Sequence, residues 1–207
     1  MRKILLLAVA SSTLAVVGTA AAVKPAAVTI SLSRSTVVYG GTVKLSGVIS
    51  THQSGANVRV LSRAYGAPTF AELASVNTTT NGAWTYTASP AILTRYQAQF
   101  GDATSRSVTV RVRPKIVLEL KSRTARRGTF MVTVNGVRPF TGKYVLVQRL
   151  TSSGPMTVKH VKLGVDSMAT FSTRLPKRHA RVRVVMPTSQ TAPGYIAGYS
   201  NVWSSSA

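Results

Sequence analysis

The side chains that most often catalyse reactions or hold metals are scarce in this sequence and lie far apart. The only acidic residues and histidines are Glu72, Asp102, Glu119, Asp166, His52, His160 and His179, and there is no cysteine. A Ser-His-Asp triad needs an acid that orients the imidazole, and neither His160 nor His179 has one nearby in sequence. Carboxylate-built calcium, paired-metal and glycosidase sites need several acids together, and thiolate zinc sites need cysteine. We expect no enzyme, no metal centre and no cofactor, although distant segments could still assemble a triad.

The chemistry that the sequence does offer is cationic. Lys and Arg number 26, the net charge is +22, and residues 114–207 hold 15 basic and 2 acidic residues against 9 and 2 in residues 23–113. Guanidinium rows suit phosphate, carboxylate or sulfate polymers. The candidate polymer-binding residues are Arg123, Arg126, Arg127, Lys159, Lys162, Lys177, Arg178, Arg181 and Arg183. The alternative is a solvated basic surface that only keeps the protein soluble.

A second candidate surface lies near the C-terminus. Tyr195, Tyr199 and Trp203 share one parity along the segment 194–203. On a regular strand they would line one face and form an aromatic platform for sugar rings. Core packing explains the same pattern, and Gly194 and Gly198 favour a bulge that would break the parity.

The first residues have the pattern of an export signal. Arg2 and Lys3 precede the apolar run 4–18, and the small residues 19–22 follow it. A charged start, an apolar middle and a small-residue cleavage site predict a signal peptide over residues 1–22. The alternative is an uncleaved membrane anchor. No later stretch is predicted to cross a membrane, so we expect a secreted or cell-surface protein.

Beyond residue 23, apolar and polar residues alternate with period two. Val58 and Val60 flank Arg59, and Val108, Val110 and Val112 alternate with polar residues in the same way. This pattern predicts strands with one face in a core and the other in water. Turn residues separate these runs at the spacing of a sandwich, and helices should be short or absent.

The second half of the sequence repeats the first. Gly41, Gly55, Val58, Val60 and Trp84 return 87 residues later as Gly128, Gly142, Val145, Val147 and Phe171, whereas Pro90 returns 86 residues later as Pro176. This regularity predicts two tandem domains, 23–113 and 114–207, each with the size of one β-sandwich. The junction at Arg113-Pro114 contains no Gly or Ser run, which predicts a stiff link.

Several motifs resemble the bacterial Ig-like or fibronectin type III-like repeats of exported, cell-surface proteins. They are Gly-Gly-Thr-Val-Lys-Leu-Ser-Gly at 40–47, Asn-Gly-Ala-Trp-Thr-Tyr at 81–86, Thr-Arg-Tyr-Gln-Ala-Gln-Phe at 94–100 and Val-Arg-Pro at 112–114. The resemblance implies an all-β protein of two tandem immunoglobulin-like β-sandwich domains after a signal peptide. It implies an architecture and not an activity.

Together these features predict a secreted, non-enzymatic structural or adhesive protein. The alternative is a binding module for anionic cell-wall polymers or glycans that uses a basic face of the second domain. The partners that these readings imply are an anionic polysaccharide or wall polymer and other surface proteins. Nucleic acid is disfavoured, because the chain is predicted to be exported and has no recognised nucleic-acid-binding motif.

Overall fold

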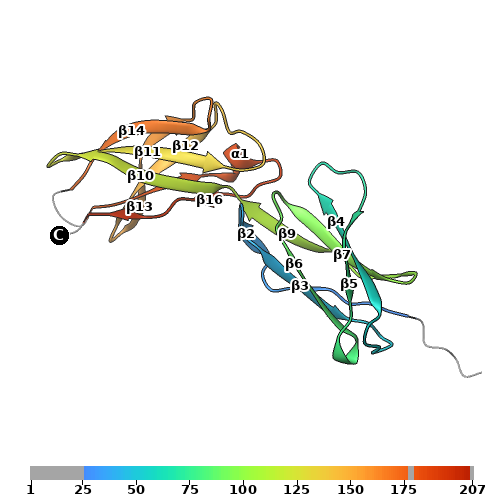
Figure 1. Cartoon of the computed structure of the whole chain (residues 1–207). Helices are drawn as coiled ribbons and strands as arrows, with labels where there is room; N and C mark the ends of the chain where they lie inside the picture. Colours follow the sequence, from blue (N-terminus) through green and yellow to red (C-terminus); the bar gives the residue numbers. More distant parts are fainter. Residues whose placement is uncertain (1–25, 177–179, 206–207) are drawn as a thin grey trace, which may run out of the picture.

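The computed structural model describes residues 26–176 and 180–205, and this part of the chain is built almost entirely from strands (Figure 1). The predicted leader, residues 1–22, lies outside the described residues. Among these described residues there are two short helical turns, η1 (Thr80–Gly82) and α1 (Thr188–Thr191). No helix among the described residues is long and apolar enough to cross a membrane. The predicted all-β architecture of tandem β-sandwiches is confirmed.

The first sandwich consists of two sheets. The smaller sheet has the order β1 (Ser31–Leu32), β3 (Val43–Val48), β6 (Ala83–Ala88). The larger has the order β2 (Thr36–Val38), β9 (Val108–Arg113), β7 (Thr94–Phe100), β4 (Asn57–Ala64), β5 (Ala71–Asn77), with β8 (Ala103–Thr104) paired to β7.

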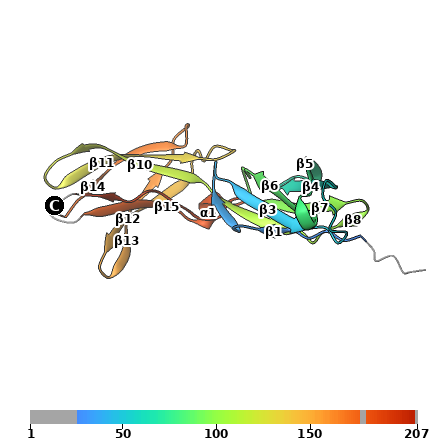
Figure 2. The same ribbon diagram turned by 60° about the horizontal axis from the view of Figure 1, so that its bottom comes forward.

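The second sandwich has the same plan. Its smaller sheet has the order β10 (Lys115–Arg123), β11 (Arg127–Asn135), β14 (Met168–Arg174). The larger has the order β13 (Gly154–Lys162), β12 (Tyr144–Thr151), β15 (Arg181–Met186), β16 (Gly198–Tyr199), with β17 (Trp203–Ser204) also on β15. The two sandwiches lie end to end, and β9 runs directly into β10 between them (Figures 1 and 2).

Alternate side chains of both sheets fill the space between them. In the first sandwich Leu45 and Trp84 come from the smaller sheet, and Val60 and Ala98 come from the larger one; all four are buried. Their neighbours on the same strands, such as Lys44, face water. The sequence has no cysteine, so no disulfide adds to the stability. Burial of these apolar side chains therefore provides most of the favourable free energy of folding.

The sequence repeat corresponds to equivalent strands. β4 spans residues 57–64 and β12 spans 144–151, so both bounds recur after 87 residues. At the next pair, β7 and β15, the offset falls to 86: the buried residues Tyr96 and Ala98 match Val182 and Val184. The division into folding domains at residues 23–113 and 114–207 stays a prediction, because it concerns which parts of the chain fold alone.

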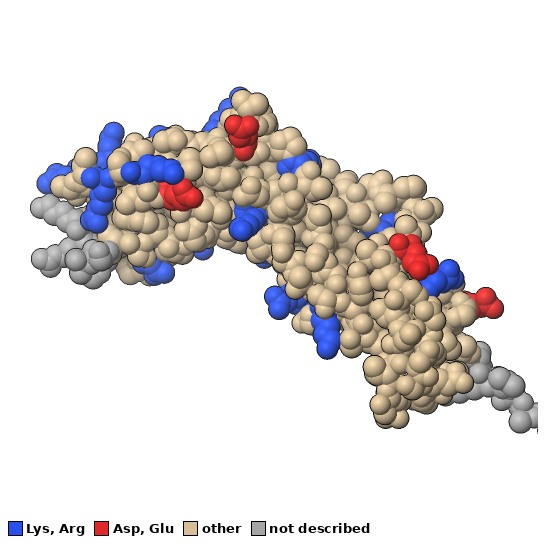
Figure 3. All heavy atoms as spheres, viewed as in Figure 1, with Lys and Arg blue, Asp and Glu red and all other residues tan. Residues whose placement is uncertain are grey.

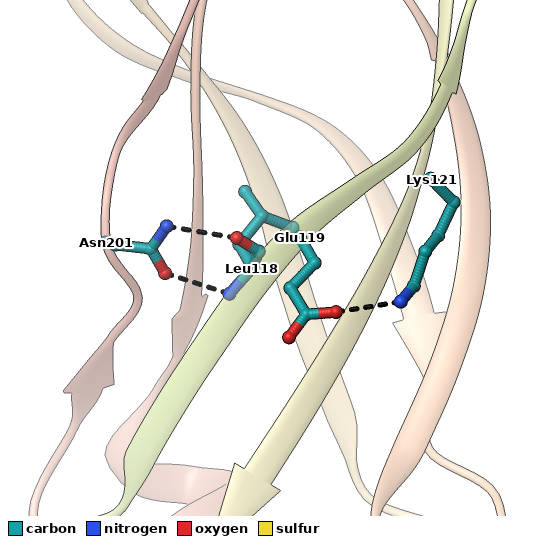
Figure 4. A network of polar contacts seen from close by, with 4 residues as sticks. All are labelled: Leu118, Glu119, Lys121 and Asn201. Carbon is teal, nitrogen blue, oxygen red and sulfur yellow. Dashed lines mark hydrogen bonds and ion pairs between the residues drawn. The ribbon is translucent and has the colours of Figure 1, made fainter.

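The segment around Asn201, between β16 and β17, connects the two sheets of the second sandwich (Figure 4). The Asn201 side chain donates to the Leu118 carbonyl oxygen at 3.0 Å and accepts from the Leu118 N–H at 2.9 Å. The amide therefore satisfies both backbone groups of a residue in β10, as a paired strand would. On the same strand, the Glu119 carboxylate pairs with Lys121 at 2.8 Å at the surface.

Candidate functional site

A segment of the second sandwich that has no counterpart in the first connects the two. Ser105 and Ser200 form the same pair of hydrogen bonds with equivalent residues: each exchanges bonds with the backbone of Ala98 or Val184. The separations are 7 residues in the first sandwich and 16 in the second. The extra residues lie in the segment 187–197, which we call the bridging segment.

The bridging segment is fastened to its own sandwich by a half-buried arginine and a buried tyrosine. The Arg138 guanidinium donates to the carbonyl oxygens of Thr191 at 2.8 Å and Pro193 at 2.7 Å. The Tyr195 ring packs edge-on against Phe140, with 5.7 Å between the ring centroids. Tyr195 is only 3% exposed. These contacts fix the segment before it reaches the first sandwich.

The same segment makes backbone hydrogen bonds to the first sandwich. The Leu93 N–H donates to the Gly194 carbonyl oxygen at 2.9 Å, and the Ile196 N–H donates to Val112 at 3.0 Å. The Tyr195 hydroxyl donates to Ala91 in the first sandwich at 2.7 Å and accepts from the Val137 N–H in the second at 2.7 Å. One side chain therefore links both sandwiches. We call this set of contacts the joint.

Burial raises the pKa of Tyr195, and this effect exceeds the opposing effect of the Val137 N–H that bonds to its oxygen. Because deprotonation would remove the donor to Ala91, the raised pKa keeps the joint intact at and above the pH where an exposed tyrosine ionises.

The joint also brings together side chains from three different strands, the exposed Tyr199 and the half-buried Arg113 and Arg183. The guanidinium carbon of Arg113 on β9 lies 5.2 Å from the centroid of the Tyr199 ring, and that of Arg183 on β15 lies 5.3 Å from it. Tyr199 is 48% exposed. Sequence reasoning placed Arg183 and Tyr199 in separate candidate sites and left Arg113 out of both. No sequence signal could join them, because the contact crosses from one sandwich to the other.

The predicted polymer-binding residues do not form a single face. Arg123, Arg126 and Arg127 lie at the turn between β10 and β11, in the smaller sheet. Lys159 and Lys162 lie on β13, at the edge of the larger sheet.

Arg181 and Arg183 are two residues apart on β15 and share the outer face of the larger sheet. Lys177 and Arg178 lie outside the described residues. In the view of Figure 3, basic side chains spread over both sandwiches and gather at the end of the second one farthest from the joint. The role of these residues in polymer binding stays a prediction.

The expected aromatic platform is wrong in its geometry. Tyr195 is buried in the joint. Trp203 pairs with Val182, whose side chain is in the core, and its ring centroid lies 5.2 Å from that of Phe130. Tyr199 pairs with Val185, which is three residues from Val182 along β15 and points to the other side of the sheet. Tyr199 therefore lies on the face opposite to Trp203. The strand is irregular between β16 and β17, where Asn201 bonds to Leu118, and this irregularity breaks the parity that the sequence suggested.

The candidate catalytic residues remain apart. His52 Nδ1 lies 3.2 Å from the Asn81 carbonyl oxygen, and His160 is exposed on β13. His179 lies outside the described residues. Within residues 26–176 and 180–205 no three His, Cys, Asp or Glu side chains gather as metal ligands would. The absence of enzymatic activity stays a prediction.

No family model matches the chain, and no curated protein matches it in sequence. Among solved structures, a tetra-tandem repeat in the extending region of a large adhesion protein is similar to it, with a TM-score of 0.37 and 13% sequence identity. The match covers 87% of this chain and 49% of that one, so this chain spans about half the length of that structure. What this chain does is therefore inferred from its own residues.

Proposed function

We propose that this chain is an exported, non-enzymatic structural or adhesive protein whose two sandwiches act as one stiff body at or outside the cell surface. The observation that supports this proposal is the bridging segment. It exists only in the second sandwich and makes several hydrogen bonds to the first. A flexible tether would need none of these bonds, whereas a spacer that holds a surface at a fixed orientation needs them.

The predicted leader gives a direct test of location. We expect the protein from its native host to be found in the medium or surface fraction, with a new N-terminus near Val23. A charge in the apolar run, Leu6→Arg, should keep most of the chain inside the cell, whereas Leu6→Val should be exported like wild type. N-terminal sequencing of fractionated cells measures both. Recovery of wild-type chain in the cytoplasm with its leader intact would contradict export.

A second candidate function, binding of an anionic polymer, is favoured by pairs of like charges. Arg63 lies directly opposite Arg95 on neighbouring strands, and Arg127 lies opposite Arg174. Like charges in these positions destabilise a sheet. Arg63 and Arg95 also line a hollow of about 180 Å³. A bound polyanion would relieve the repulsion.

Polymer binding predicts a steep dependence on salt. We expect the full chain to be retained on a sulfated or carboxylated polysaccharide column, and its affinity to fall by orders of magnitude between about 50 and 200 mM salt, as counterion release requires. Isothermal titration at three salt concentrations measures the slope. A lack of retention at the lowest salt would exclude this second function and leave the structural role untouched.

A further inference from the structure

We propose that the joint carries an oxyanion-binding site formed by Arg113, Arg183 and Tyr199, and that this site takes the acidic groups of a linear anionic polysaccharide lying across both sandwiches. The inference rests on the second function proposed above and gives it a location. The site differs from the basic turn of the second sandwich that the sequence pointed to, because one of its two arginines belongs to the first sandwich.

The two guanidinium groups are held in place by uncharged partners. Arg183 Nε donates to the Gln148 side-chain oxygen at 2.9 Å, and Arg113 donates to the Ala197 carbonyl oxygen. Both also lie over the Tyr199 ring. A guanidinium has five N–H donors, so each arginine keeps several for a ligand. Arginines that are already oriented lose less entropy when they bind a carboxylate or sulfate in bidentate geometry.

Acidic side chains do not neutralise these charges. All four acidic residues of the sequence lie within the described part, and the ion pairs found there are Arg59 with Glu72 and Lys121 with Glu119. Two unneutralised guanidinium groups on one tyrosine ring repel each other. An oxyanion bound between them would attract both guanidinium groups and so offset their mutual repulsion.

The site lies within a row of arginines that crosses the joint. Arg111 precedes Arg113 by two residues on β9, and Arg181 precedes Arg183 by two residues on β15, so each pair shares a face with a spacing of about 7 Å. Arg113 lies at the end of β9 nearest the second sandwich. Arg181 is farther from the joint than Arg183, because it pairs with Ser204 while Val185 pairs with Tyr199. The row suits an extended polymer better than a single small ion.

The chemistry of the site favours an anionic polysaccharide over nucleic acid. Proteins that hold single-stranded nucleic acid use aromatic rings on which bases stack. At Tyr199 guanidinium groups lie over the ring, so the ring orients the arginines, and a base would have to displace them in order to stack. The site therefore recognises charged oxygens. A chain that is exported would meet such groups on polysaccharides of the cell surface or matrix.

The test compares two double variants of the full chain with equal net charge. Arg113→Gln with Arg183→Gln removes the site, and Lys44→Gln with Arg106→Gln removes two exposed charges of the first sandwich that lie outside the joint. The probes are heparin, polygalacturonate and single-stranded oligothymidylate. We expect the first variant to bind the polysaccharide probes at least about tenfold more weakly, because each charge-assisted contact contributes strongly. Its salt slope should fall by about 2, and the control should lose less than about threefold.

Each other outcome overturns a defined part of the proposal. Equal losses in the two variants would show that diffuse charge binds the polymer, which removes the site but not the second function. Tighter binding of wild type to oligothymidylate than to either polysaccharide would overturn the ligand class. If the double variant does not fold, the single variant Arg183→Gln provides the test instead. Among the described residues, the Arg183 side chain hydrogen-bonds to Gln148 of the same sandwich, so this change leaves the hydrogen bonds between the two sandwiches in place. An unchanged affinity in that variant would also overturn the site.

Discussion

Replacing Gly47 with alanine is expected to destabilise the first sandwich by about 3 kcal/mol or more, at the upper end of what overpacking costs. A β-carbon at residue 47 would lie 1.9 Å from the Thr29 carbonyl oxygen and 2.7 Å from the Trp84 indole nitrogen. Thr29 is held there by backbone hydrogen bonding to Val48, and Trp84 is 1% exposed. Neither neighbour can move without breaking the pairing of β3 or opening the core.

Intrinsic fluorescence measures this effect, because the chain has two tryptophans and one lies in each sandwich. With Trp203→Phe as the background, Trp84 reports the first sandwich alone. The midpoint of its thermal unfolding should fall by roughly 12 °C or more, at about 4–8 °C for each kcal/mol in a domain of this size.

The matched control is Gly40→Ala, where a β-carbon would meet nothing within 4 Å but the backbone has φ +84°. That change lowers the free energy of unfolding only by the strain of holding a residue with a β-carbon in the left-handed region, about 1–2 kcal/mol. Equal midpoints in the two variants would mean that the close approach at Gly47 does not limit stability.

The strands and their buried faces could be predicted from sequence, because alternation is a local signal. The alternation at 58–60 and at 108–112 correctly indicated that Val58, Val60, Val110 and Val112 are buried. The repeat of 87 residues predicted the matching bounds of β4 and β12. Both signals depend only on which side chains must leave water.

The joint could not be predicted, because its contacts join residues about a hundred positions apart. The bridging segment looks like an ordinary polar loop, and nothing near Tyr195 indicates that its hydroxyl reaches Ala91. The parity of Tyr195, Tyr199 and Trp203 suggested one aromatic face, but it holds only if the strand is continuous. The hydrogen bonds of Asn201 to Leu118, which no local pattern reveals, accompany the break in that strand.

Replacing Tyr195 with alanine is expected to uncouple the two sandwiches while leaving most strands intact. The change removes the hydroxyl that bonds to Ala91 and Val137 and the ring that packs on Phe140. Loss of a buried aromatic ring typically costs about 3–5 kcal/mol. Much of that loss should fall on the joint, because Tyr195 belongs to the bridging segment and to no strand.

Distances between two spin labels test this expectation directly. The chain has no native cysteine, so Thr87→Cys on the first sandwich and Thr170→Cys on the second, both exposed, take the labels without competition. We expect one narrow distance distribution for wild type, a distribution at least twice as broad for Tyr195→Ala, and no change for Tyr144→Ala, where the tyrosine is 45% exposed.

The pH dependence gives the same test without a mutation at the joint. The pKa of Tyr195 is raised by burial, so the folded joint holds its proton more tightly than the separated state does. Its stabilising effect is therefore complete below the ordinary tyrosine pKa of about 10 and declines as the pH rises above it. The wild-type distribution should therefore stay narrow at and just above that pH, and broaden only as the pH approaches the raised pKa of Tyr195. A distribution that is broad at neutral pH, or equally narrow in Tyr195→Ala, would contradict a stiff joint held by this residue and remove the main support for a structural role.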